Sequence, residues 1–105
     1  GDCDAYVNLA GGMKLGEPAI DLGIVLAVVS SYKNKVVDQG ILIFGEVGLS
    51  GEVRGVSMAE NRVREAEKLG FTTCIMPKAN IDAMQGKYQI RLIGVANIKE
   101  AMEYI

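Results

Sequence analysis

The sequence lacks histidine altogether and contains only two cysteines, Cys3 and Cys74, which lie far apart along the chain. Without histidine, this chain alone cannot perform Ser-His-Asp or Cys-His catalysis. Two thiols are too few ligands for a structural zinc site. Distant cysteines in a chain rich enough in apolar residues to form a core are typical of reduced thiols in a cytosolic protein, so we expect a cytoplasmic location. Cys74 lies between apolar neighbours, and we predict that it is buried and inert.

The sequence has neither a dominant charge nor a long apolar run. Its 13 acidic and 11 basic residues give a formal charge of −2, which does not favour an autonomous DNA-binding domain but allows a basic face on a larger assembly. The longest apolar run, Leu22 to Val29, is too short to span a bilayer, and no signal-peptide pattern is present. We therefore expect no membrane partner.

The length of 105 residues, half of them hydrophobic, predicts one domain over residues 1–105. The chain begins without an initiator methionine and enters a strand-like segment, Ala5 to Leu9, almost at once. We therefore expect a fragment of a longer protein.

The segment from Ile41 to Phe71 organises the rest of the pattern. An apolar, β-branched run from Ile41 to Phe44 predicts a buried strand, and a second short strand is predicted at Val53 to Val56. The intervening glycines indicate bends or close backbone approach. They fit neither G-x-x-x-x-G-K-[ST] nor G-x-G-x-x-G, so we interpret them as backbone geometry and not as a phosphate loop.

A helix is predicted after the second strand. Ser57 and Glu60 form an S-x-x-E capping box, and Gly70 is placed as a C-cap glycine. Glu60 and Arg64 have the i,i+4 spacing of an ion pair. The apolar positions predicted to face the core are Ala59, Val63, Ala66 and Leu69.

Two further helices and two further strands complete the prediction. A helix opened by Pro18 covers Ala19 to about Ser31 and lacks a polar face, so we expect it to be covered on most sides. Strands are predicted at Thr72 to Met76 and Gln89 to Val95. A last helix is capped by Asn97, with Glu100 completing the box and Ile98, Ala101, Met102 and Ile105 facing the core. This alternation predicts an α/β (α+β) fold with at least partly parallel strand pairing.

Charged side chains offer two weak site hypotheses. Paired carboxylates for acid/base chemistry are conceivable for Glu17 with Asp21 and for Glu46 with Glu52, although helix-start and turn charges explain them more simply. The candidates for DNA contact are Lys33, Lys35, Arg54, Arg62 and Arg64. An ordinary solvated helix face explains the last two equally well.

Three motifs resemble a known family. They are Val7-Asn8-Leu9-Ala10-Gly11-Gly12, Glu17-Pro18-Ala19-Ile20-Asp21-Leu22, and the run from Phe44 to Arg54, with Lys68-Leu69-Gly70-Phe71 and Pro77 continuing the match. In this order they resemble the C-terminal domain of the RadA/Sms family of bacterial DNA-repair ATPases. That domain is similar to the proteolytic domain of Lon proteases, a variant of the ribosomal S5 domain 2 fold, here without its N-terminal strands.

The Lon resemblance predicts the state of a catalytic dyad. Lon proteases use a serine in a Gly-Pro-Ser-Ala-Gly motif and a lysine on the helix after the glycine-rich hairpin. The matching positions hold Ala19 and Arg62. Alanine offers no nucleophile, and arginine stays protonated and cannot act as a general base. The resemblance therefore implies a domain that is not an enzyme, with no catalytic residues.

The resemblance also implies partners and cofactors. The whole protein would be a DNA-dependent ATPase that forms a hexameric ring and promotes branch migration in recombination. ATP, Mg and Zn would bind only in N-terminal regions absent from this sequence, so no cofactor is expected here. This domain would then be a homo-oligomer scaffold with auxiliary DNA contact. Two alternatives are a divergent Lon-like peptidase that uses another nucleophile and a protein-interaction module.

Overall fold

The computed structural model describes residues 17–84 and 86–105, and within them the chain builds a parallel sheet with helices on both faces. The sheet has the order β1-β4-β5, and both pairings are parallel, as predicted. Its strands are β1 (Ile41–Ile43), β4 (Thr73–Pro77) and β5 (Arg91–Val95). A separate antiparallel hairpin joins β2 (Glu46–Val47) to β3 (Val53–Arg54). The strand predicted at Ala5 to Leu9 lies outside the described residues.

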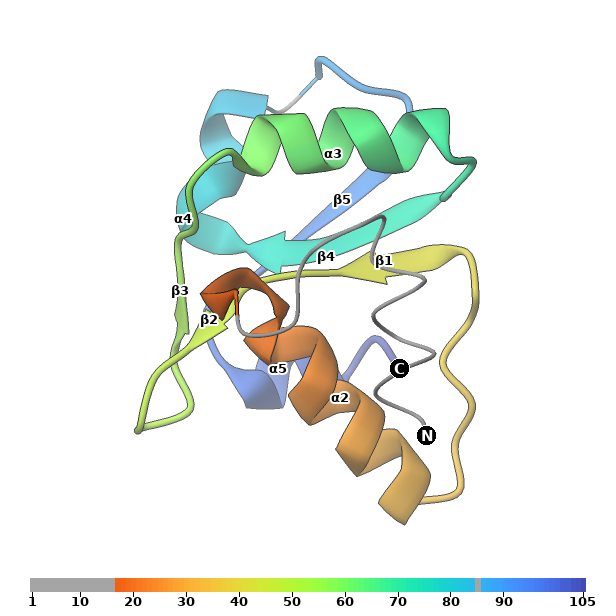
Figure 1. Cartoon of the computed structure of the whole chain (residues 1–105), viewed down its shortest axis with the longest axis vertical. Helices are drawn as coiled ribbons and strands as arrows, with labels where there is room; N and C mark the ends of the chain where they lie inside the picture. The colour runs from red at the N-terminus through yellow and green to blue at the C-terminus, as the bar shows by residue number, and fades with distance from the viewer. Residues whose placement is uncertain (1–16, 85) are drawn as a thin grey trace.

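Helices cover the sheet because strand side chains alternate between its two faces. Figure 1 shows α3 (Ala59–Lys68) and α4 (Lys78–Ile81) on one side of the sheet, with α2 (Asp21–Tyr32) and α5 (Ile98–Met102) on the other. Short 3₁₀ turns, η1 (Pro18–Ile20) and η2 (Asp82–Met84), precede α2 and follow α4. The largest fully buried side chains include Phe44, Ile75 and Met76, so the sheet forms the centre of the core. The α/β fold class is confirmed.

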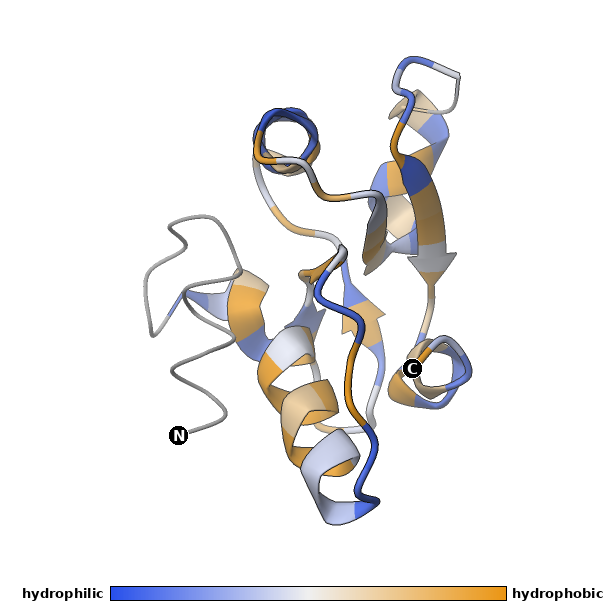
Figure 2. Ribbon diagram, turned by 90° about the vertical axis from the view of Figure 1, so that its right-hand side faces the viewer, coloured by the Kyte–Doolittle hydropathy of each residue, from blue (hydrophilic) through white to orange (hydrophobic). Residues whose placement is uncertain are grey.

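The helix α2 is confirmed, but it is not covered on most sides. Leu22 and Leu26 are fully buried, whereas Val28 is 56 % exposed and Tyr32 is 89 % exposed. Figure 2 shows the apolar colouring continuing along α2, although only one of its faces meets the sheet. The expectation of all-round cover was wrong because apolar composition does not reveal how far a helix extends beyond its neighbours.

The helix α3 matches its predicted apolar face except at its end. Ala59, Val63 and Ala66 are buried, but Leu69 is 55 % exposed. The helix ends at Lys68, and Gly70 at φ +91° reverses the chain. The amide of Phe71 donates to the carbonyl of Ala66 at 3.0 Å and that of Gly70 to Glu67 at 3.2 Å, which is the Schellman arrangement. Phe71 then packs against the core in place of Leu69.

The predicted capping box of α3 is wrong. The N-cap position belongs to Met58, in a left-handed conformation at φ 58°, and no side chain caps this end. Ser57 therefore lies one residue before the N-cap, and its side chain does not accept hydrogen bonds from the amides of the first turn. Glu60 instead accepts a hydrogen bond from the Tyr88 hydroxyl at 2.7 Å, which holds the pKa of Glu60 below its ordinary value.

The helix α5 begins as predicted. The Asn97 side chain accepts the Glu100 amide at 2.8 Å. In a standard capping box the Glu100 carboxylate would accept the amide of the N-cap residue, Asn97. Here it accepts the amide of the preceding residue, Ala96, at 2.6 Å. Ala101 is buried, and the other three predicted residues pack against the core. None of the described helices is both long enough and apolar enough to cross a membrane.

Candidate functional site

A pocket of about 220 Å³ opens where the start of α2, the end of the hairpin and the start of α3 meet. Both Ala19 and Arg62, the two dyad positions identified from the resemblance, contribute to its wall. The other lining residues are Glu17, Pro18, Glu46, Gly55, Val56 and Ser57. Residues that are 43 positions apart in sequence (62 − 19) thus meet at one site.

Backbone hydrogen bonds fix the position of Ala19. The Gly45 amide donates to the Ala19 carbonyl at 2.7 Å, and the Leu22 amide donates to the Gly45 carbonyl at 2.9 Å. Gly45 has φ +157°, and a Cβ there would lie 3.0 Å from Cγ1 of Val53. This backbone conformation therefore favours glycine where the chain leaves β1 beside α2. Ala19 itself is only 3 % exposed.

Arg62 is held by two contacts across the pocket. Its Nη2 lies 2.7 Å from Oε1 of Glu17, forming an ion pair, and its Nε donates to the Ser57 carbonyl at 3.4 Å. The Arg62 side chain is only 16 % exposed, so this pair is better shielded from solvent than the two others on the described surface. A guanidinium so engaged remains charged and cannot accept a proton.

One polar residue of the pocket was not foreseen as a site residue. Ser57 lines the same pocket and, since it does not cap α3, its hydroxyl has no hydrogen-bond partner among residues 17–84 and 86–105. Neighbouring carboxylates are Glu17, which is bound to Arg62, and Glu46. The capping interpretation concealed Ser57, because a serine three residues before a glutamate also fits the ordinary helix-start pattern.

The proposed carboxylate pairs do not form. Glu17 binds Arg62, whereas Asp21 accepts the Val47 amide at 3.3 Å. Across the hairpin Glu46 is opposite Arg54, not Glu52.

Glu52 instead folds back over the hairpin turn. It accepts the Ser50 amide at 3.0 Å and an Arg54 N–H at 2.9 Å. Its own backbone amide, followed by Arg54, lowers the pKa of the Glu52 carboxyl. Glu52 is thus an ionised turn residue and not half of an acid/base pair.

The glycine-rich run builds a tight hairpin, in agreement with the backbone-geometry interpretation. Gly51 donates to the Gly48 carbonyl at 3.0 Å and adopts φ +80°. Farther along, the Asn80 side chain holds the link to α3 by accepting the Val56 amide at 2.8 Å and donating to its carbonyl at 3.1 Å.

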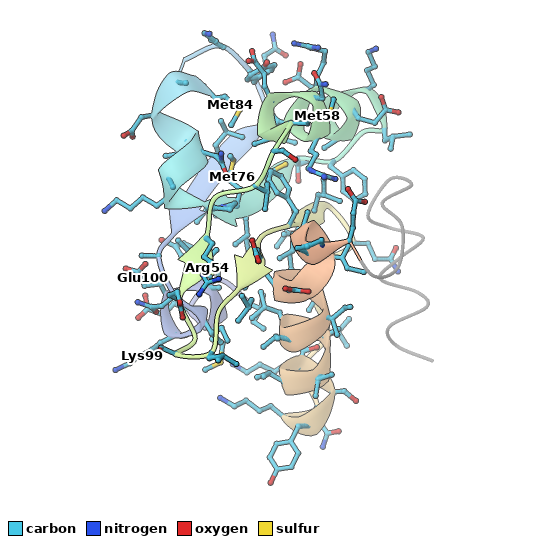
Figure 3. All side chains as sticks on the ribbon, turned by 60° about the vertical axis from the view of Figure 1, so that its left-hand side comes forward. Arg54, Met58, Met76, Met84, Lys99 and Glu100 are labelled. Carbon is cyan, nitrogen blue, oxygen red and sulfur yellow. The ribbon has the colours of Figure 1, made fainter. Side chains whose placement is uncertain are left out.

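The five basic candidates do not gather in one patch. Lys33 and Lys35 are exposed in the loop after α2, at the bottom of the view in Figure 1, whereas α3 with Arg62 and Arg64 crosses its top. Arg54 projects from the hairpin, near the part of α5 that carries Lys99 and Glu100 (Figure 3). Each of the three candidate arginines already has an acidic partner: Arg54 with Glu52, Arg62 with Glu17, and Arg64 with Glu60 at 3.9 Å, the i,i+4 pair that was predicted.

Cys74 is fully buried in β4, and burial, followed by the charge of Glu67, raises its pKa to about 12. The prediction of an inert thiol is confirmed. Cys3 lies outside the described residues. Within the described part of the chain, no cluster of three or more potential metal ligands occurs.

Comparison with known proteins adds the family. A family model described as "Subunit ChlI of Mg-chelatase" matches residues 3–80. The chain is also similar to proteins named DNA repair protein RadA: it is 52 % identical over 99 residues to that of Bacillus subtilis (strain 168), and 45 % identical over 107 residues to that of Aquifex aeolicus (strain VF5). These matches cover 94 % and 99 % of the chain but only 22 % and 23 % of the relatives, so the chain spans less than a quarter of their length. The chain therefore belongs to the family described as subunit ChlI of Mg-chelatase, and nearly its whole length is homologous to one segment of the bacterial DNA repair protein RadA, in agreement with the resemblance to the RadA/Sms family.

Proposed function

We propose that this chain is a proteolytically inactive, Lon-like domain that acts as a hexamer scaffold in a RadA-type DNA repair protein and adds auxiliary DNA contact. The observation that carries the proposal is the pocket shared by Ala19 and Arg62. The Lon resemblance predicts that these two positions lie together, and the fold places them together although they are distant in sequence.

The contacts in the pocket support loss of protease chemistry. A methyl group stands in place of the serine hydroxyl, and a guanidinium bound to Glu17 stands in place of the lysine amine. The Arg62–Glu17 pair joins the beginnings of α2 and α3, so the position of a catalytic base now carries a structural contact. The order of parallel strands, hairpin and helices is compatible with the S5-like architecture that the resemblance implies.

The relatives named RadA favour DNA repair over the chelatase role in the description of the family model. Identity of 52 % extends over 94 % of the chain. In the whole protein, the DNA-dependent ATPase activity and branch migration would reside in the part outside this chain, together with the sites for ATP, Mg and Zn.

Among the DNA-contact candidates, we favour Lys33 and Lys35. Both are exposed and have no acidic partner among the described residues, whereas Arg54, Arg62 and Arg64 are each paired. Unpaired lysines can neutralise phosphates without first breaking an internal ion pair. The three arginines are secondary candidates, and Arg62 is the least accessible of them.

Deletion tests the scaffold. The full-length protein and a version lacking residues 1–105 are compared by sedimentation velocity. We expect a ring for the first and loss or weakening of the ring for the second. A deletion variant that assembles as well as the full-length protein would refute the scaffold role.

Three variants test the absence of protease chemistry. The full-length protein should not cleave unstructured peptides, and Ser57→Ala should change nothing. Hydrolysis that copurifies with the protein and disappears in Ser57→Ala or Arg62→Ala would instead support the divergent peptidase. The Ala19→Ser, Arg62→Lys double variant asks whether the pocket still supports a dyad.

The salt dependence of DNA binding tests the two lysines. The double substitution Lys33→Glu, Lys35→Glu should reduce the slope of log K against log[salt] by about 0.7–0.9 per lost phosphate contact. The control with the same charge change, Lys68→Glu with Lys99→Glu, alters exposed lysines elsewhere. Equal slopes for the two double variants would exclude this loop as the contact.

A further inference from the structure

The strand β5 has an unpaired edge within the part of the chain that the structure describes. It pairs with β4 on one side, and on the other side no described strand pairs with Arg91–Val95. The hairpin strand β3 bonds only the residues that follow β5: the Val53 amide donates to the Ala96 carbonyl at 2.8 Å. The Arg91 amide donates to the Thr72 carbonyl at 3.0 Å, so Arg91 directs its main-chain groups toward β4. Because successive residues of a strand direct these groups to alternate sides, Leu92 and Gly94 direct theirs outward. Such an edge is a template for one more strand.

A groove of about 370 Å³ is associated with this strand. It is lined by Lys78, Ile81, Asp82, Arg91, Leu92, Ile93, Gly94 and Tyr104. These residues come from α4, η2, β5 and the end of the chain after α5. The helix α4 packs so closely on Gly94 that a Cβ there would lie 3.2 Å from Cα of Lys78. One wall of the groove is therefore formed by closely packed backbone. Tyr104 is 43 % exposed and adds an aromatic side chain to the lining.

The charges of the groove favour an acidic occupant. Lys78 and Arg91 are exposed, and neither has an ion pair with a described residue. Asp82 is the only acidic residue among those that line the groove. The groove is thus locally cationic on a chain whose formal charge is −2. An antiparallel pairing of two β5 edges would bring these cations from two copies together, so charge disfavours self-association here.

We propose that the β5 edge binds an extended, acidic segment of a separate protein by strand addition. Outward main-chain groups of Leu92 and Gly94 would bond the backbone of the segment, and Lys78 and Arg91 would bind its carboxylates. A polypeptide suits this edge because its backbone can continue the ladder of the sheet, which a sugar-phosphate backbone cannot do. This site is distinct from the Ala19–Arg62 pocket and does not depend on the scaffold proposal.

A synthetic peptide tests the proposal with the full-length protein. The probe is a fluorescein-labelled peptide of alternating Val and Glu, nine residues long, whose binding is followed by anisotropy. A peptide with Lys in place of Glu is the charge control, and a peptide N-methylated at alternate residues on one edge is the backbone control. We expect the Val-Glu peptide to bind at least about tenfold more tightly than either control, which corresponds to about 1.4 kcal/mol.

Protein variants locate the site. Lys78→Glu and Arg91→Glu should each weaken binding about tenfold, whereas Lys99→Glu, an exposed charge reversal on α5, should not. Leu92→Pro removes an outward amide without removing a bond to β4 and should abolish binding. The proposal is overturned if the Val-Glu peptide does not bind at millimolar concentration, if the controls bind equally, or if Lys78→Glu and Arg91→Glu bind as well as Lys99→Glu. Displacement by single-stranded DNA but not by unlabelled peptide would also overturn it, in favour of a nucleic-acid site.

Discussion

Truncation of Glu67 should loosen the entry into β5. Oε2 of Glu67, on α3, accepts the amide of Gln89 at 3.0 Å and that of Ile90 at 3.1 Å. One carboxylate thereby ties the segment before β5 to a helix more than twenty residues earlier in the chain. Ile90 is only 5 % exposed, whereas Gln89 is exposed. The loss of the carboxylate therefore leaves one amide accessible to water and one buried.

The magnitude follows from that difference. Water can replace the bond to Gln89, so its net contribution is small, while a buried amide without a partner costs about 1–3 kcal/mol. We expect Glu67→Ala to lower the free energy of unfolding by about 2 kcal/mol. Glu67→Gln keeps an acceptor oxygen but loses the negative charge, so it should cost about half as much.

Urea unfolding followed by circular dichroism provides the measurement. With a slope of about 1–3 kcal/mol/M for a small domain, Glu67→Ala should lower the midpoint by about 1 M. Glu65→Ala is the matched control, because it makes the same change on the exposed side of α3, where the Glu65 side chain forms no hydrogen bond or ion pair with a described residue. If Glu67→Ala and Glu65→Ala unfold at the same urea concentration, the carboxylate does not hold this segment.

Three further predictions follow from burial and backbone geometry. Leu26→Ala should lower the free energy of unfolding by about 2–5 kcal/mol, because Leu26 is fully buried. Val28→Ala, on the exposed part of α2, should change it by no more than about 0.5 kcal/mol. If thermal unfolding shows equal losses for the two variants, the orientation of α2 is contradicted. Gly70→Ala should lower the free energy of unfolding in urea by about 1 kcal/mol, because a residue with a side chain is strained at φ +91° even though nothing lies within 4 Å of the added Cβ. An unchanged free energy of unfolding would contradict the Schellman turn. The fold raises the pKa of Cys74 from 9.0 to about 12. The protonated thiol therefore contributes fully to the free energy of unfolding below pH 9, and this contribution is lost as pH rises toward 12. Native protein at pH 8 should resist iodoacetamide at Cys74 by peptide mass spectrometry and react in urea; rapid native labelling would show that the thiol is accessible.

Local sequence patterns determined much of the fold. The alternation of apolar strands with helices predicted the α/β class and parallel pairing, because parallel strands need crossover connections. Gly70 and Asn97 marked helix ends correctly, and Pro18 marked the start of the 3₁₀ turn η1 that precedes α2, since each acts through its own backbone or a neighbour three residues away. The buried thiol of Cys74 followed from its apolar neighbours.

Tertiary structure decided what depends on distant segments. The Ser57–Glu60 pattern fitted a capping box, but Met58 occupies the N-cap and Tyr88 takes Glu60 instead. The exposure of Val28 and of Leu69 depends on where neighbouring elements end, which no local period records.

The candidate site itself shows the same division. Sequence resemblance named Ala19 and Arg62, but only the fold placed them in one pocket, bound Arg62 to Glu17 and added Ser57 to the wall. The unpaired β5 edge and its groove also emerge only in three dimensions, because strand order is a property of long-range pairing. Short-range patterns specify secondary structure through local hydrogen bonds and burial periodicity, whereas a site requires contacts between residues that only chain folding brings together.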